Sequence, residues 1–169
     1  MVKQKSSGRT VGTPALVALA DAGVGHTSRA YEHDPRGPLG YGLEAAAALG
    51  VDPARVFKTL VTTVDGTLTV AVVPVNATVD LKALASAVRG KRALMADHAA
   101  AERATGYVVG GISPIGQKQR LRTVIDASAS DHATVLVSAG RRGLDVELAP
   151  TDLVAVTGAT LAAIARTEK

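Results

Sequence analysis

Residues 106–118, Gly-Tyr-Val-Val-Gly-Gly-Ile-Ser-Pro-Ile-Gly-Gln-Lys, join a short apolar run to a loop rich in glycine and proline, and the segment ends in a basic residue. Glycine adopts backbone conformations that other residues avoid, so the pattern predicts a strand that enters a specially shaped loop. Loops of this kind are usually functional sites or tight corners. We expect the rest of the chain to hold this segment, the glycine loop, in place.

The glycine loop lacks two features of a nucleoside triphosphate site. Gly111 and Gly116 have the spacing of the outer glycines in a nucleotide-binding P-loop, but Gln117 stands where that loop needs its lysine. Pro114 also removes one of the N–H groups that would cradle a phosphate. The sequence therefore does not predict a nucleoside triphosphate site.

Ser113 is a poor candidate for a catalytic nucleophile. In a nucleophile elbow, the residue after the serine donates its backbone N–H to the oxyanion hole, and here that residue is proline. The loop could instead bind a carbonyl oxygen or a developing oxyanion, although a purely structural turn explains the glycines equally well. The backbone N–H groups available for such binding are those of Gly110, Gly111 and Ile112.

The composition is that of an ordinary globular domain, with 47% hydrophobic and 20% charged residues in a chain of 169. No apolar run could span a bilayer and the first residues do not form a signal core, so we expect a cytoplasmic protein without membrane contact. The absence of cysteine excludes disulfides, thiolate metal sites and a cysteine nucleophile. The four histidines show no paired metal-binding spacing, so we expect neither a metal nor another cofactor.

The chain is basic, with a net charge of +4 and clustered cations. Such clusters suggest a polyanionic partner, but charged outer faces also keep alanine-rich helices soluble. Aromatic residues are too few to stack several bases, so contact with a nucleic acid should involve its backbone and one end. The clusters are Lys82, Arg89, Lys91 and Arg92; Lys118, Arg120 and Arg122; and Arg141 and Arg142.

Apolar spacing, caps and turns predict short helices that alternate irregularly with strands. The expected helices cover 15–22, 43–49, 81–88, 98–104 and 150–156. The expected strands cover 27–33, 56–64, 67–75, 92–95, 122–126, 133–137 and 144–148. A polar turn is expected over 138–143, and residues 160–166 could form a strand or a helix. This order predicts a mixed α/β fold with a curled, barrel-like sheet flanked by helices. We expect one domain over 13–169, preceded by a flexible basic arm over 1–12.

Lys58 stands out because apolar or β-branched residues surround it on both faces of its predicted strand. Its ammonium group would therefore enter a partly buried region, although a lysine whose stem reaches out to solvent at a strand end explains the pattern equally well. With the glycine amides, the polar groups at turn edges suit the binding and polarising of an ester better than its attack. These groups are Lys58, Tyr41, Ser113, Ser138 and Asp145.

Three segments, 55–61, 105–118 and 137–150, resemble the signatures of the YbaK/EbsC-type aminoacyl-tRNA deacylases. These proteins are free-standing relatives of the editing domain inserted in bacterial prolyl-tRNA synthetases. The likeness runs in order from about Thr13 to the end of the chain. It implies a trans-acting hydrolase that deacylates mischarged Cys-tRNA(Pro), in a transient complex with prolyl-tRNA synthetase.

The resemblance also implies roles for particular residues. Lys58 and Gly111 match the catalytic positions of the family, which is thought to use the cysteine thiol and the terminal ribose hydroxyl of the substrate instead of a protein nucleophile or metal. The matching substrate-binding residues are Tyr31, Tyr41, Gly110, Ile112, Ser113, Ser138 and Asp145. Tyr41 replaces a frequent phenylalanine and adds a hydroxyl, which leaves the preferred amino acid open. The two alternatives to Cys-tRNA(Pro) hydrolysis are another substrate such as Ala-tRNA(Pro), and a non-catalytic module that binds the tRNA end.

Overall fold

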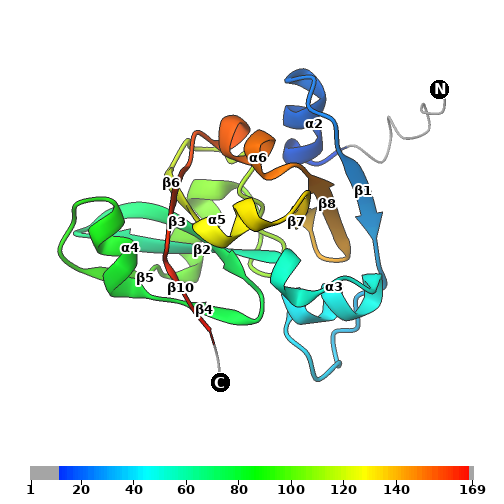
Figure 1. Cartoon of the computed structure of the whole chain (residues 1–169), viewed down its shortest axis with the longest axis horizontal. Helices are drawn as coiled ribbons and strands as arrows, with labels where there is room; N and C mark the ends of the chain where they lie inside the picture. The colour runs from blue at the N-terminus through cyan, green and yellow to red at the C-terminus, as the bar shows by residue number, and fades with distance from the viewer. Residues whose placement is uncertain (1–11, 168–169) are drawn as a thin grey trace.

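The computed structural model describes residues 12–167, and its largest element is an open five-stranded sheet (Figure 1). Its strands, in the order β5-β2-β3-β6-β9, are Ala93–Met95, Phe57–Val64, Thr67–Pro74, Arg122–Asp126 and Thr160–Ala162. A tight turn at Asp65 and Gly66 joins the two long antiparallel strands β2 and β3, as the sequence predicted. β6 runs parallel to β3, and β9 runs parallel to β6.

A three-stranded antiparallel sheet and a separate strand pair accompany the large sheet. The smaller sheet has the order β1 (Thr27–Ala30), β8 (Leu144–Leu148) and β7 (Val135–Arg141), and β4 (Ala77–Val79) pairs with β10 (Ala165–Thr167). An isolated parallel bridge between Val56 and Leu136 connects the two larger sheets. The mixed α/β fold is confirmed, but a barrel-like sheet is wrong, because the three-residue edge strands β5 and β9 do not pair with each other.

Five short α-helices lie against the sheets within residues 12–167 (Figure 1). Asp80 and Asp97 cap the N-termini of two of them, and Thr13 caps a third whose first residue is proline, as their positions in the sequence predicted. No helix in this part of the chain has the length and apolar character needed to cross a membrane. The helices are α2 (Pro14–Asp21), α3 (Tyr41–Leu49), α4 (Leu81–Ala87), α5 (His98–Thr105) and α6 (Pro150–Thr157), and the 3₁₀ turns are Pro53–Arg55 and Ala127–Asp131.

The five-stranded sheet is packed on both faces, which explains why its central strands lack polar alternation. In β3, Val70 and Val72 join one hydrophobic cluster while Ala71 and Val73 join another, and all four are completely buried. Successive side chains of a strand point to opposite faces, so both faces of β3 are core. Helix α4 covers one of these faces through Leu84.

Three segments differ from their predicted structure. Residues 107–109 form no strand, and helix α5 delivers the chain into the glycine loop instead. The polar turn expected over 138–143 is mostly strand, because a bulge between Ser138 and Arg141 lets β7 absorb the glycine there. Residues 160–166 divide into parts of β9 and β10, and β4 was not predicted. The arm expected over 1–12 lies, apart from Gly12, outside the described residues.

Candidate active site

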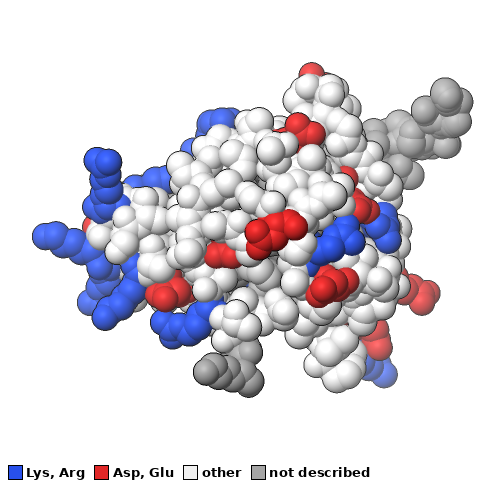
Figure 2. Space-filling model, viewed as in Figure 1, with Lys and Arg blue, Asp and Glu red and all other residues white. Residues whose placement is uncertain are grey.

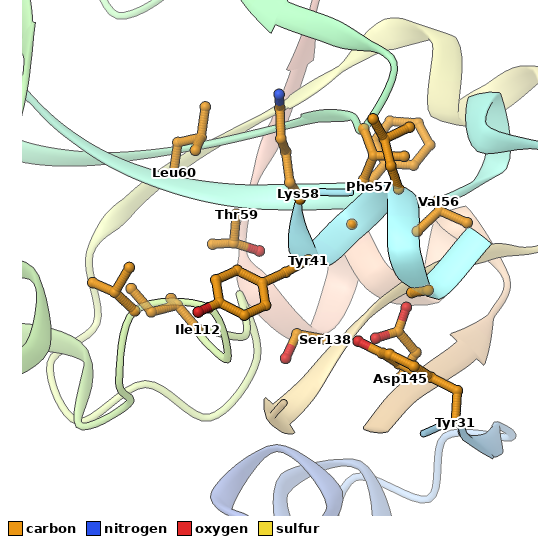
Figure 3. A pocket seen from close by; sticks show the side chains of 17 residues that line it. Tyr31, Tyr41, Val56, Phe57, Lys58, Thr59, Leu60, Ile112, Ser138 and Asp145 are labelled. Carbon is orange, nitrogen blue, oxygen red and sulfur yellow. The ribbon is translucent and has the colours of Figure 1, made fainter. Parts of the chain in front are cut away.

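A cavity of about 340 Å³ lies between the start of β2, helix α3, the glycine loop and the β7–β8 pair (Figure 3). This volume suits a small ligand or the end of a larger one. The cavity brings together residues from all three segments that carry the family resemblance, together with two tyrosines that precede them in the chain. The expected site residues that line it are Tyr31, Tyr41, Lys58, Gly110, Ile112, Ser138 and Asp145.

A buried carboxylate forms one end of the cavity. Asp145 lies on β8 directly opposite Ser138 of β7, and only 5% of its surface is exposed. This burial raises the pKa of the Asp145 carboxyl to about 6. The ring of Tyr31 lies beside it, and burial, followed by the charge of Asp145, raises the pKa of the Tyr31 hydroxyl to about 12 (Figure 3). The site therefore holds a desolvated negative charge that would favour a cationic ligand group.

The pKa of Asp145 has a measurable consequence for stability. Because the folded-state pKa of about 6 lies above the unfolded value of 3.8, the folded protein binds more protons between these pH values. This contribution to the free energy of unfolding is therefore full below about pH 4 and falls as pH rises to 6, by about 3 kcal/mol at most. Asp145→Asn should remove this slope in urea unfolding measured from pH 4 to 7. An unchanged slope would show that Asp145 titrates normally.

The glycine loop turns tightly before it reaches the cavity. The N–H of Gly111 donates to the carbonyl of Val108 over 2.9 Å, and Gly110, in the third position of this turn, has a φ of +94° that suits glycine. The Gly111 amide is thus already engaged, contrary to the expectation that it is available to a ligand. Within residues 12–167, the N–H groups of Gly110 and Ile112 donate no hydrogen bond, so these two amides can serve a ligand.

Gly111 does not line the cavity but packs against the tip of the β7–β8 hairpin. A Cβ atom on Gly111 would lie 2.9 Å from Cα of Arg141 and 3.0 Å from the backbone nitrogen of Arg142. Both contacts are with backbone, which cannot rotate away as a flexible side chain can. The close approach at Gly111 is therefore a packing contact between the glycine loop and the β7–β8 hairpin.

Ser113, predicted as a substrate-binding residue, also does not line the cavity. The residue is completely buried, and its hydroxyl accepts a hydrogen bond from the N–H of Ile115 over 3.2 Å. Its carbonyl accepts another from the Gln117 side chain over 2.9 Å. Ser113 shapes the loop from inside, in agreement with the sequence argument against a nucleophile at this position.

Arg142 links the glycine loop to helix α3. Its guanidinium group donates to the carbonyl of Val109 over 2.6 Å and lies 5.0 Å from the ring centroid of Tyr41, within the range of a cation–π contact. The ring of His33 lies on Tyr41 as well, at a centroid distance of 5.2 Å. The sequence placed Arg142 only in a basic cluster, because this contact joins residues far apart in the chain.

Lys58 and Thr59 project to opposite sides of β2, with Thr59 directed toward Ile112 of the glycine loop (Figure 3). The Lys58 side chain is half-buried, as its apolar surroundings predicted. The Thr59 hydroxyl is buried and has no hydrogen-bond partner among the described residues, a state that costs free energy in a folded protein. Thr59 was not predicted as a site residue, although it adjoins Lys58 in a segment that carries the family resemblance.

This arrangement supplies the kinds of group that are needed to bind and polarise a ligand. No group of three or more histidine, aspartate or glutamate side chains within residues 12–167 is placed to hold a metal ion. The cavity instead offers one cation, one buried carboxylate, hydroxyl groups and two backbone amides. Such groups can orient an ester and stabilise charge on its carbonyl oxygen.

Comparison with known proteins agrees with this class of site. Residues 42–156 match the model of the aminoacyl-tRNA editing domain, so the chain belongs to this family, which consists of hydrolases. A relative from Enterococcus faecalis (strain ATCC 700802 / V583), named "Putative Cys-tRNA(Pro)/Cys-tRNA(Cys) deacylase EbsC", is 41% identical over 124 residues, which cover 73% of this chain and 76% of that protein.

Solved structures share the fold. A crystal structure titled as that of "a putative trans-editing enzyme for prolyl tRNA synthetase" has a TM-score of 0.80 at 23% identity and covers 90% of this chain and 95% of its own. A crystal structure of a hypothetical protein also has a TM-score of 0.80, at 24% identity, and covers 90% of this chain and 99% of its own. At these identities the likeness concerns the fold.

Proposed function

We propose that this protein is a trans-acting editing hydrolase that removes cysteine from mischarged Cys-tRNA(Pro), with prolyl-tRNA synthetase as a transient partner. The observation that carries the proposal is the cavity, which is lined by Lys58, Asp145 and the glycine-loop residues Gly110 and Ile112 and is large enough for an aminoacyl group. The name of the Enterococcus relative, which gives both Cys-tRNA(Pro) and Cys-tRNA(Cys), supports the choice of cysteine and includes tRNA(Pro).

The proposed substrate would match the charges of the cavity. The α-ammonium group of an aminoacyl ester is a cation that would compensate the buried carboxylate of Asp145. The ester carbonyl would accept hydrogen bonds from the N–H groups of Gly110 and Ile112. Lys58 would orient the terminal ribose and phosphate through its charge. The cavity presents no protein nucleophile paired with a base, so the thiol or ribose hydroxyl of the substrate would take part in breaking the ester.

The decisive experiment measures release of cysteine, alanine and proline from separately charged tRNA(Pro), with and without prolyl-tRNA synthetase. We expect cysteine to be released fastest and proline to be released very little. Faster release of alanine would assign the related specificity for Ala-tRNA(Pro). No release of any amino acid would overturn the hydrolase and leave a module that binds the tRNA end.

Thr59→Val should separate function from stability. Valine nearly preserves the shape and removes a buried hydroxyl without a partner, so the free energy of unfolding should stay the same or rise by about 1 kcal/mol. If the hydroxyl binds the substrate, kcat/KM for deacylation should fall about tenfold, the loss expected for one hydrogen bond.

Thr62→Val on the same strand is the matched control. The Thr62 hydroxyl is buried but donates to the carbonyl of Thr69 over 2.7 Å, so this variant should lose stability and keep its activity. A Thr59→Val protein with unchanged kcat/KM would remove Thr59 from the site.

A further inference from the structure

Exposed cations gather at the end of the molecule formed by helix α4 and the tips of strands β2 and β5 (Figure 2). This basic tip comprises four residues from α4 and from the segment that joins it to β5. None of the four takes part in an ion pair with another residue in the range 12–167. The residues are Lys82, Arg89, Lys91 and Arg92.

The backbone around the basic tip is held in a definite shape. Asp65, in the β2–β3 turn, accepts the N–H groups of Lys91 and Arg92 with its two carboxylate oxygens, over 2.9 and 3.0 Å. These bonds lower the pKa of Asp65 and satisfy its oxygens, and the side chains of both basic residues are left exposed. The nearby carboxylate of Asp80 is paired with Arg166.

Arg89 occupies a position where stability alone favours glycine. Helix α4 ends with two backbone bonds, from Arg89 to the carbonyl of Ser86 and from Gly90 to the carbonyl of Ala85. This is the Schellman pattern, whose left-handed residue is usually glycine. Here that residue is Arg89, with a φ of +60°, while the glycine comes one position later. An arginine kept in a strained conformation and exposed to solvent suggests a function for its charge.

Strand β2 connects the cavity to the basic tip. Lys58 lines the cavity and Val64 ends the strand beside the tip, and six residues of strand span about 20 Å. Met95 of β5, 51% exposed, pairs with Thr62 between the two regions and offers an apolar surface on the way. Stacked nucleotides advance about 3.4 Å each, so a tRNA whose 3′ end fills the cavity and whose acceptor strand runs along β2 would bring phosphates of its base-paired stem to the tip.

Each of the other two basic clusters contains an arginine that is engaged within the fold. Arg142 is engaged with Val109 and Tyr41 at the cavity, and Arg122 donates two hydrogen bonds to the Thr69 hydroxyl. We propose that the basic tip binds the phosphates of the tRNA acceptor stem, while the cavity holds the aminoacylated 3′ end. This inference rests on the proposed function for the identity of the RNA.

The first test is Arg89→Gly. Glycine suits the left-handed position, so the melting temperature should rise, while the affinity for an RNA hairpin that copies the acceptor stem should fall about fivefold at moderate salt. A cation that serves only solubility would give the higher melting temperature with unchanged RNA binding, and this result would overturn the proposal.

The second test compares two double variants that each remove two positive charges. Lys91→Gln/Arg92→Gln should reduce the slope of log affinity against log salt by about 2 for the same RNA hairpin, without an attached amino acid. Lys118→Gln/Arg120→Gln, which alters exposed residues outside the tip, should leave most of that slope. Equal losses in the two variants would mean that net charge alone matters, and would overturn the proposal.

Hydrolysis assays keep this proposal distinct from the proposed function. The tip variant should raise KM for full-length aminoacyl-tRNA and leave hydrolysis of an aminoacylated CCA trinucleotide unchanged, because that fragment is too short to reach the tip. A tip variant impaired equally on both substrates would overturn the proposal. If the unmodified protein hydrolyses neither substrate, the proposed function fails, while hairpin binding still decides the role of the tip.

Discussion

Replacing Lys58 by alanine should lower kcat/KM for deacylation by about 100-fold or more and leave the fold intact. Removal of one organising charge or oxyanion donor from an active site typically has an effect of this size. The Lys58 side chain is half-buried at the cavity, and its flexible stem lets the amino group approach a bound ester. The measurement is single-turnover release of cysteine from charged tRNA(Pro), together with urea unfolding of the variant.

Lys58→Met is the control that separates the ammonium group from its apolar stem. Methionine retains most of the packing of the stem against the cavity wall, so the stability of this variant should match that of the unmodified protein. Its deacylation should nevertheless be as slow as that of Lys58→Ala. A folded Lys58→Met protein with near-normal activity would show that the charge plays no part in the reaction.

Gly111→Ala should also lower kcat/KM by about 100-fold, for a reason that the sequence did not reveal. The added methyl group would meet the backbone of Arg141 and Arg142, so the glycine loop must move away from the β7–β8 hairpin. A displacement of about 1 Å at a site can cost about 100-fold in rate, and overpacking of this kind also lowers stability by about 1–3 kcal/mol. Circular dichroism melting and single-turnover assays measure the two effects.

Two substitutions calibrate the result at Gly111. Gly25→Ala adds a methyl group at a position with no heavy atom within 4 Å and no left-handed backbone, so its activity and stability should stay normal. Ser113→Ala removes a buried hydroxyl that bonds within the loop and does not line the cavity, so appreciable activity should remain. A Gly111→Ala protein of normal stability that is still inactive would point to direct contact between this glycine and the substrate.

The sequence predicted those parts of the fold that depend on local chemistry. The turn at Asp65 and Gly66 and the capping residues Asp80 and Asp97 act on neighbouring backbone groups, so their residue types alone indicate the structure. The openness of the sheet could not be predicted in the same way. It depends on whether β5 and β9 meet, and no feature within either short strand decides that.

The candidate site shows the same division between local and distant information. Lys58 and Asp145 were predicted from their surroundings and from family resemblance, and the structure places both at one cavity. Thr59 was not predicted, because only the folded structure shows that its hydroxyl has no hydrogen-bond partner among residues 12–167. Gly111 and Ser113 were predicted at the site but do not line the cavity, because a linear motif does not show which residues of a loop face outward.

Arg142 joins the glycine loop to the start of helix α3. Its two contacts, a hydrogen bond to Val109 and a cation–π contact with Tyr41, each contribute about 1 kcal/mol at an exposed site. Breaking both therefore costs about 2 kcal/mol, which corresponds to a few per cent of molecules with the link released at equilibrium. The glycine loop and helix α3 therefore stay joined in most molecules, and a small fraction is free to separate.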